Sequence, residues 1–142
     1  TRSSARTCCC PLRAGPPPGL RPGALEGRVQ VHDPCSLVNV LRAEAAPYRL
    51  LEGIPGLEVA PLAGNDTCCG SAGTYMLEHP QTAEALVAPK AAAAAESGAR
   101  WVATSNVGCA LHLRAALADQ GVEVVHPVSL LAAALSPGDA AG

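Results

Sequence analysis

The sequence contains no phenylalanine, and aromatic residues amount to only 2% of its 142 residues. Apolar residues still make up 49% of the chain, so a core must be built from alanine, valine and leucine. This length is enough for one compact domain but too short for two of typical size. We therefore expect a single domain with a core of small aliphatic side chains.

Strong net charge, long apolar runs and a secretory signal are also missing. The formal net charge is -2, which gives no broad basic field for nucleic acid. No run of 18 apolar residues could form a transmembrane segment, and the N-terminus has no apolar signal region. The seven cysteines are an odd number, which argues against a fully paired disulfide framework. We expect a reducing compartment, the cytoplasm, with the protein free or peripheral to the inner face of the membrane.

Two common redox motifs are absent as well. The chain has no Gly-x-Gly-x-x-Gly loop for a dinucleotide and no cluster of basic residues to hold a carboxylate. It also has no Cys-x-x-Cys pair, which makes a thioredoxin-like thiol exchanger a poor explanation. We expect no catalytic residue for substrate oxidation in this chain.

Four of the seven cysteines follow an ordered pattern. Cys68 and Cys69 are adjacent and cannot bridge each other without strain, so they need other partners or a shared metal. Between Cys35 and this pair there are 32 residues, and between the glycine that follows the pair and Cys109 there are 38. We interpret the four thiols as one iron-sulfur site. Zinc is the rival metal because four thiolates satisfy it, although its ligands usually come as Cys-x-x-Cys pairs.

Alternating and helical patterns predict the fold. Short strands are expected at residues 29–32, 57–62, 101–104 and 122–125. The segments between them predict a broken crossover at 37–51, a helix from Ser71 restarting at Pro80 with a kink at Pro89, and a helix at 110–117. A last helix is expected at 128–135. This alternation predicts an α/β fold with a small four-stranded parallel sheet and crossover helices.

The carboxyl ends of parallel strands meet at one edge, which is where ligand sites form. Each candidate thiol follows a predicted strand, and each precedes a helix whose free N–H groups favour a thiolate. His32 and His126 end strands at the same edge, although a histidine before a turn more often caps backbone groups. A single free cysteine is most often a small buried hydrophobe, so only the four together indicate a site. The glycines expected to allow close backbone approach are Gly70, Gly73 and Gly108.

Five segments resemble the cysteine-rich CCG domain of heterodisulfide reductases, lactate-utilisation proteins and, most closely, the glycolate oxidase iron-sulfur subunit. They are His32-Asp33-Pro34-Cys35, residues 50–58, the segment Cys68-Cys69-Gly70-Ser71-Ala72-Gly73-Thr74-Tyr75, residues 102–109 and residues 126–131. The resemblance implies that Cys35, Cys68, Cys69 and Cys109 bind an iron-sulfur cluster of the 4Fe-4S type. Many CCG domains have a further cysteine where this chain has Asn106, which favours an ordinary cubane cluster here.

The same resemblance implies the function and the domain plan. It implies an electron-transfer subunit, or its C-terminal fragment, that takes electrons from a flavoprotein (FAD) partner and passes them toward quinone. The alternatives are a heterodisulfide reductase-like thiol catalyst and a structural zinc module. Residues 1–27, with Cys8, Cys9 and Cys10, are expected to form a Pro/Gly-rich leader, residues 28–135 the domain and residues 136–142 a tail.

Overall fold

The structure is a computed structural model that describes residues 19–135. Cys8, Cys9 and Cys10 and the expected tail at 136–142 lie outside the described residues. Four strands form one sheet in the order β2-β1-β3-β4, with every neighbouring pair parallel. They are β1 (Gly27–Val31), β2 (Leu57–Pro61), β3 (Trp101–Ala103) and β4 (Glu123–Val125). The predicted α/β class with a four-stranded parallel sheet is confirmed.

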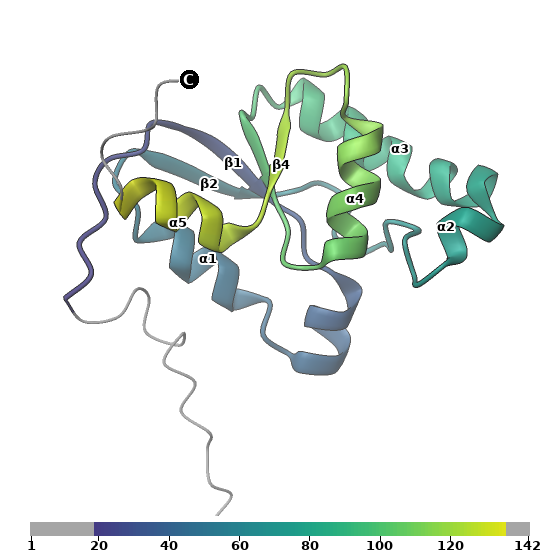
Figure 1. The fold of residues 1–142 in the computed structure, drawn as a ribbon, viewed down its shortest axis with the longest axis horizontal. Helices are drawn as coiled ribbons and strands as arrows, with labels where there is room; N and C mark the ends of the chain where they lie inside the picture. Colours follow the sequence, from purple (N-terminus) through teal and green to yellow (C-terminus); the bar gives the residue numbers. More distant parts are fainter. Residues whose placement is uncertain (1–18, 136–142) are drawn as a thin grey trace, which may run out of the picture.

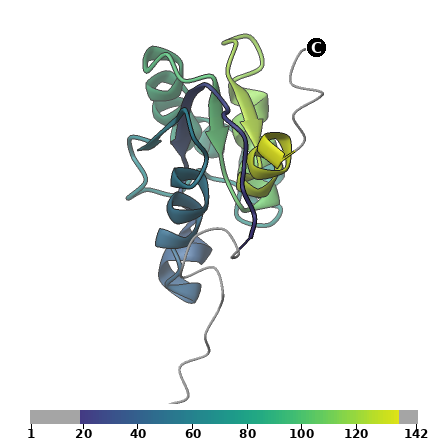
Figure 2. The ribbon, with the colours of Figure 1, turned by 90° about the vertical axis from the view of Figure 1, so that its left-hand side faces the viewer.

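Helices connect the strands and cover both faces of the sheet, as Figures 1 and 2 show. The helical elements are η2 (Leu37–Leu41, a π-helix), α1 (Ala45–Glu52), α2 (Tyr75–Glu78), α3 (Pro80–Glu96), α4 (Val107–Ala116) and α5 (Pro127–Leu135). Helices α1 and α5 pack together on one face, and α3 and α4 on the other. Within residues 19–135, no helix has the length and apolar character needed to cross a membrane.

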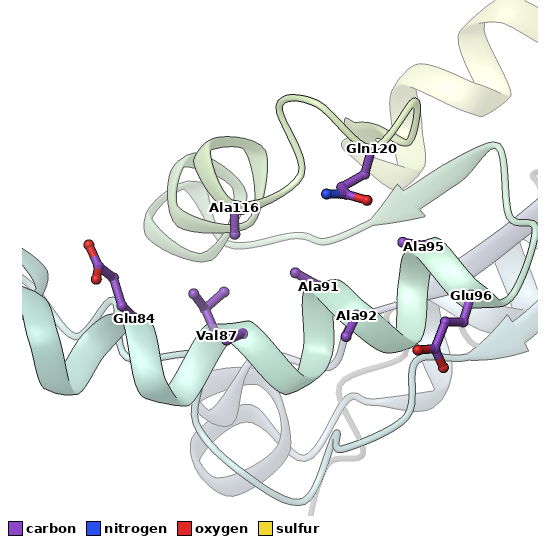
Figure 3. A pocket seen from close by; sticks show the side chains of 9 residues that line it. Glu84, Val87, Ala91, Ala92, Ala95, Glu96, Ala116 and Gln120 are labelled. Atoms are coloured by element: carbon purple, nitrogen blue, oxygen red, sulfur yellow. The ribbon is translucent and has the colours of Figure 1, made fainter.

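The core between the sheet and helices α3 and α4 is built from small aliphatic side chains. Val102 and Val124 face this side and pack against a buried group formed by Leu62, Val87, Ala91, Ala94, Leu113 and Leu117. An open cleft of about 490 Å³ runs between α3 and α4, and alanine side chains make up most of its lining (Figure 3). No cysteine lines this cleft.

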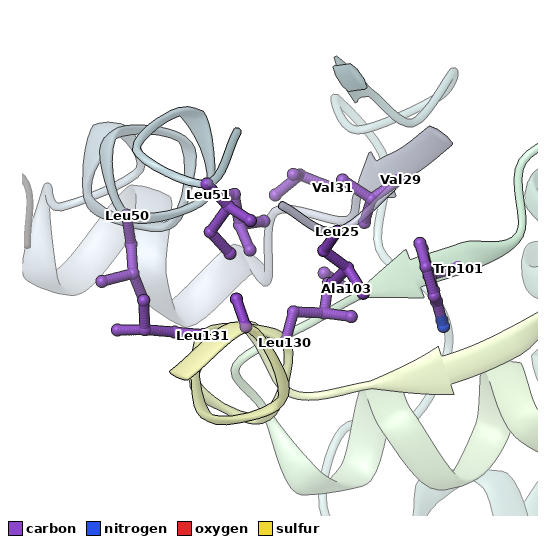
Figure 4. Packing of buried hydrophobic residues seen from close by; sticks show 11 residues of the cluster. Leu25, Val29, Val31, Leu50, Leu51, Trp101, Ala103, Leu130 and Leu131 are labelled. Atoms are coloured by element: carbon purple, nitrogen blue, oxygen red, sulfur yellow. The ribbon is translucent and has the colours of Figure 1, made fainter. Parts of the chain in front are cut away.

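The second core lies between the sheet and helices α1 and α5 (Figure 4). Strand residues that alternate with Val102 point to this side, because successive side chains of a strand face opposite ways. The cluster contains Leu25, Val29, Val31, Leu50, Leu51, Ile54, Trp101, Ala103, Leu130, Leu131 and Ala134. Trp101 is its one aromatic member that is fully buried, so the expectation of an aliphatic core agrees with the structure.

The helices differ from the sequence expectations at two points. No helix begins at Ser71, because α2 starts at Tyr75 and Ser71 lies in the preceding loop. The apolar spacing of residues 37–41 predicted a helix, and these residues do form one, but none of them is buried. Helix α3 starts with Pro80 as expected and continues through Pro89 as one helical run. The kink at Pro89 stays a prediction.

The last residues of the expected leader contact the domain. The Gly23 N–H donates to the Ala134 carbonyl at the end of α5 at 2.7 Å, and the Leu25 N–H donates to Pro55 at 2.9 Å. The Leu25 side chain is buried in the core beside α1 and α5. The described part of the leader therefore adds a buried side chain to the domain, and β1 begins one residue before the expected boundary at 28.

Candidate metal centre

Three crossovers bring the four candidate thiols to the carboxyl edge of the sheet. Cys35 follows β1 just before η2, Cys68 and Cys69 lie in the loop after β2, and Cys109 is in the first turn of α4 after β3. The side chains of Cys35 and Cys68 are in hydrogen-bond contact, as are those of Cys69 and Cys109. Cys35 also interacts electrostatically with both Cys69 and Cys109, so the two pairs form one group.

A buried trio lies at the centre of this group. Ligand atoms of His32, Cys69 and Cys109 all lie within 4.8 Å of one another, and all three residues are buried. A hydrogen bond fixes the orientation of the His32 ring, because its Nδ1 lies 3.1 Å from the Thr104 Oγ1. The sequence favoured a capping role for this histidine, whereas its side chain is directed at the cysteines.

Ser71 is a member of the site that sequence reasoning missed. Its Oγ lies 3.1 Å from the Cys69 Sγ and donates to the Cys109 Sγ at 3.6 Å. The residue is buried and directly follows Gly70, in a segment where a helix start was expected. The small polar residue right after the Cys68-Cys69-Gly70 run was the available sequence signal.

The pKa values of the two buried thiols, Cys69 and Cys109, are shifted in opposite directions. The hydrogen bond with Cys109 holds the pKa of Cys69 well below its ordinary value, and contacts with His32 and Ser71 act in the same direction. The same bond, together with burial, raises the pKa of Cys109. Cys69 is therefore the more acidic of the two thiols. Cys35 lies at the exposed side of the group, and there partial burial and the neighbouring Cys68 raise its pKa.

A polar network ties the loop of Cys35 to the loop of Cys68 and Cys69. The Asn65 side chain bonds to Val31 and Asp33, and the Tyr48 hydroxyl donates to the Asp33 Oδ2 at 2.9 Å. Burial raises the pKa of the Asp33 carboxyl, while burial and the Asp33 carboxylate raise the pKa of Tyr48. Neither contact has a local sequence signal, because Asn65 reaches Asp33 through the pairing of β1 with β2 and Tyr48 reaches it through the packing of α1.

Asn106 lies at the N-terminus of α4 and caps it. Its Oδ1 accepts a hydrogen bond from the Cys109 N–H at 3.2 Å, so the side chain is engaged with its own helix. A Cβ on Gly108 would lie 3.2 Å from the Ser71 carbonyl, which shows that α4 and the Ser71 loop are in close contact. Glycine at 108 thus permits the approach of Cys109 to Cys69.

The remaining predicted residues lie in different surroundings. The Gly70 N–H donates to the Cys68 Sγ at 3.3 Å, and a Cβ at Gly70 would meet the Ala83 backbone at 2.9 Å. Gly73 has a left-handed φ of 54°, but a Cβ at this position would meet no heavy atom within 4 Å, so the residue serves a turn and no close approach. His126 is exposed, and its Nδ1 accepts from the Val128 N–H at 3.1 Å. It caps α5 and is not part of the buried trio.

The donor set suits a soft metal centre. Thiolates are the usual ligands of iron-sulfur clusters and are also good ligands for zinc, and a neutral imidazole can ligate either metal. The fold and these side chains define a class of protein: a parallel α/β domain with a Cys/His group at the carboxyl edge of its sheet.

The chain belongs to the CCG family, whose model, described as a cysteine-rich domain, matches residues 29–114. It is 33% identical over 102 residues to Lactate utilization protein A of Shouchella clausii, a match that covers 70% of this chain and 43% of the relative. It is 29% identical over 108 residues to the protein of the same name in Oceanobacillus iheyensis, covering 75% of this chain and 44% of the relative. A third relative is Uncharacterized protein YkgE of Escherichia coli, 32% identical over 110 residues and covering 76% of this chain and 46% of the relative. The chain thus spans less than half the length of these relatives, and no solved structure gives a significant match.

Proposed function

We propose that this chain is an iron-sulfur electron-transfer domain of a flavin-dependent 2-hydroxy-acid oxidoreductase. Cys35, Cys68, Cys69 and Cys109 are the proposed ligands of a 4Fe-4S cluster. The observation that carries the proposal is the convergence of these four thiols from three separate crossovers at one edge of the sheet. Such convergence is expected of a ligand set and has no purpose in ordinary core packing.

When bound, the cluster supplies one-electron chemistry, and the protein supplies ligands and their surroundings. The lowered pKa of Cys69 favours its thiolate, which is the ligating form of cysteine. The Ser71 hydroxyl donates to the Cys109 Sγ and the Gly70 N–H donates to the Cys68 Sγ, and such donors stabilise the more negative state of a centre. Asn65 and Asp33 keep the two thiol-bearing loops in register.

Substrate oxidation belongs, in this proposal, to a flavoprotein partner that passes electrons through the cluster toward quinone. The cleft between α3 and α4 supports this division, since Glu84 and Glu96 line it and no basic residue does. A 2-hydroxy-acid carboxylate would be repelled there. Glycolate is the substrate named by the family resemblance and lactate the one in the relatives' name, and the proposal assigns the binding of either to the partner. We place the complex in the cytoplasm or at the inner face of the membrane.

The test of the cluster is anoxic purification followed by visible spectroscopy and analysis of iron, sulfide and zinc. We expect broad brown absorption with iron and sulfide. Cys→Ser substitution at position 35, 68, 69 or 109 should lower the iron content. Replacement of Cys8, Cys9 and Cys10 together is the matched control and should leave iron unchanged. A leader variant that lost iron while Cys68→Ser kept it would refute the ligand assignment.

Structural zinc is the second candidate, because the buried trio alone offers one imidazole and two thiolates within 4.8 Å. In that case His32 is a ligand, and His32→Ala should release zinc from a colourless protein. If the cluster is held by four thiols, His32→Ala should keep the brown colour and the iron. Metal analysis of this one variant therefore separates the two functions.

The electron path is tested in the assembled complex. The chain alone should oxidise no 2-hydroxy acid, because a one-electron centre cannot accept a hydride while a flavin can. Combined with its flavoprotein, it should support reduction of a quinone analogue by lactate or glycolate. Cys69→Ser should slow this reaction at equal flavin occupancy. Equal rates for both proteins would leave the domain a scaffold role only.

A further inference from the structure

Lys90 is the only lysine in the sequence, and it is almost completely buried. Only 1% of its surface is exposed, although the side chain is charged. It lies in α3 directly after Pro89, and its ammonium donates to the Gly64 carbonyl. Burying an ammonium group is costly unless hydrogen bonds and nearby negative charge compensate it. The surroundings of Lys90 therefore need a physical explanation.

Helix α3 packs against the loop after β2 that carries Cys68 and Cys69, here called the cysteine loop. Ala83 and Lys90 are seven residues apart, so two turns separate them on one helix face. A Cβ at Gly70 would lie 2.9 Å from the Ala83 Cα, and a Cβ at Gly64 would lie 3.7 Å from the Lys90 Nζ. Gly64 and Gly70 bound the loop that carries Cys68 and Cys69. The Lys90 ammonium consequently lies at the base of this loop.

Most of the groups that act electrostatically on Lys90 are cysteines. Burial lowers the pKa of Lys90, and the opposing interactions that raise it come from Cys69, Asp66, Cys68 and Cys109 in that order. Asp66 is the one carboxylate among these groups. Three of the four proposed ligands thus act on this one ammonium group.

We infer that Lys90 is the counter-charge of the metal centre and that it positions the cysteine loop through Gly64. This inference rests on the proposed function. Each electron that the centre accepts from a one-electron reductant adds one negative charge. A fixed cation in a partly dehydrated interior stabilises the reduced form more than the oxidised form, and so raises the reduction potential.

The experiment is a potentiometric titration of the intact chain after anoxic reconstitution with iron and sulfide. Lys90→Met removes charge and hydrogen bond, Lys90→Gln keeps a donor without charge, and Lys90→Arg keeps the charge. We expect a lower potential for the Met and Gln variants and a potential near wild type for Arg. Arg21→Met is the matched control, since Arg21 is exposed and lies near the segment that contacts the far end of α5. It should leave the potential unchanged.

A second readout does not depend on iron. Because Lys90 is the sole lysine, acylation of an ε-amine reports on this residue alone, and it should be slow in the folded chain and fast in denaturant. Fast acylation of the folded chain would overturn the buried placement on which the inference rests.

The outcomes separate the inference from the proposed function. A wild-type chain that binds no iron-sulfur cluster would overturn the proposed function, and the inference with it. A wild-type cluster whose potential equals that of Lys90→Met would overturn the inference alone. Loss of fold in all three Lys90 variants, seen by circular dichroism, would assign Lys90 to folding and also overturn it.

Discussion

Asn65 and Asp33 are joined by two hydrogen bonds that connect the loops after β2 and β1. The Asn65 Nδ2 donates to the Asp33 Oδ2 at 2.9 Å, and the Asn65 Oδ1 accepts from the Asp33 N–H at 3.1 Å. The same Nδ2 also donates to the Val31 carbonyl at 2.8 Å, at the end of β1. One amide side chain therefore fixes the distance between the segment that leads to Cys35 and the segment that leads to Cys68.

Asn65→Ala should destabilise the fold and loosen the site. Loss of the amide leaves the Asp33 N–H without its acceptor, and an unpaired buried group costs about 1–3 kcal/mol. The Asp33 carboxylate and the Val31 carbonyl each lose one donor but still accept from Tyr48 and from the Leu62 N–H. Urea unfolding followed by the fluorescence of Trp101, the one tryptophan, measures the change. The iron content after reconstitution should fall as well.

Asn39→Ala provides the matched control for this substitution. Asn39 is exposed on η2, so the same change in side chain should alter stability and iron content little. If the two variants lost the same stability, the bridge between Asn65 and Asp33 would contribute nothing measurable.

Asn106→Ala should weaken the N-terminus of α4. Its Oδ1 accepts from the Cys109 N–H, and losing such a cap costs about 0.5–2 kcal/mol. Asn106→Asp should restore most of the stability, because aspartate caps helices as well as asparagine does. Asn106→Cys would recreate a Cys-x-x-Cys spacing, yet it should lose the cap. Thermal unfolding of the three variants should therefore rank Asp above both Ala and Cys, and an equal melting temperature for Ala and wild type would show that the cap is dispensable.

The sheet and its site edge could be predicted because each strand has a local signature. Alternating apolar residues ended by His32-Asp33-Pro34 mark β1, and its neighbours have similar short patterns. Parallel pairing then places everything that follows a strand at one edge. The helix expected near Ser71 begins only at Tyr75, because the loop before it is fixed by long-range contacts, with Gly70 against Ala83 and Ser71 against Cys109.

The surroundings of the thiols were harder to predict than the thiols themselves. Which groups approach Cys69 depends on the order β2-β1-β3-β4, since this order brings His32 and Cys109 next to the loop of Cys69. The burial of Lys90 depends on how α3 packs against that loop, which no local pattern contains. His126 ends the last strand at the same edge, yet a local bond to Val128 turns its ring to cap α5.

Glu58→Gln should destabilise the chain slightly near neutral pH and not in acid. Arg28 and Glu58 are paired across β1 and β2, and the Arg28 Nη2 lies 2.6 Å from the Glu58 Oε1. The hydrogen bond from Arg28 lowers the pKa of Glu58 from its ordinary value. A lowered carboxyl pKa contributes stability that is present above the unfolded-state value and is lost as pH falls through the folded-state value. Both side chains are exposed, so the effect should be small and should shrink with added salt.

The urea midpoints of wild type and Glu58→Gln, measured at neutral pH and at about pH 3, test this prediction. The difference should be present at neutral pH and absent in acid. Arg28→Met should lose more stability than Glu58→Gln, because Arg28 also donates to the Ser97 carbonyl at 2.8 Å. A difference between wild type and Glu58→Gln that persisted in acid would place its origin outside the ion pair.

Ser71→Ala should raise the pKa of Cys69 in the cluster-free chain. The Ser71 hydroxyl lies 3.1 Å from the Cys69 Sγ, and its contact is among the causes that lower the pKa of this thiol. A hydrogen bond to a charged group contributes about 1.5–3 kcal/mol, which corresponds to roughly one to two pKa units. Ultraviolet absorbance of the thiolate against pH measures the shift, with Cys8, Cys9 and Cys10 replaced by serine to reduce the background.

Ser105→Ala is the control, because Ser105 is exposed and lies in the neighbouring loop before Asn106. It should leave the titration of Cys69 unchanged, and Ser71→Thr should keep most of the wild-type behaviour because the hydroxyl remains. If Ser71→Ala titrated like wild type, the Cys69 thiolate would be held by Cys109 and His32 without the hydroxyl. In the iron-loaded chain the same loss of a donor should favour the oxidised state, so the potential of Ser71→Ala should lie below that of wild type.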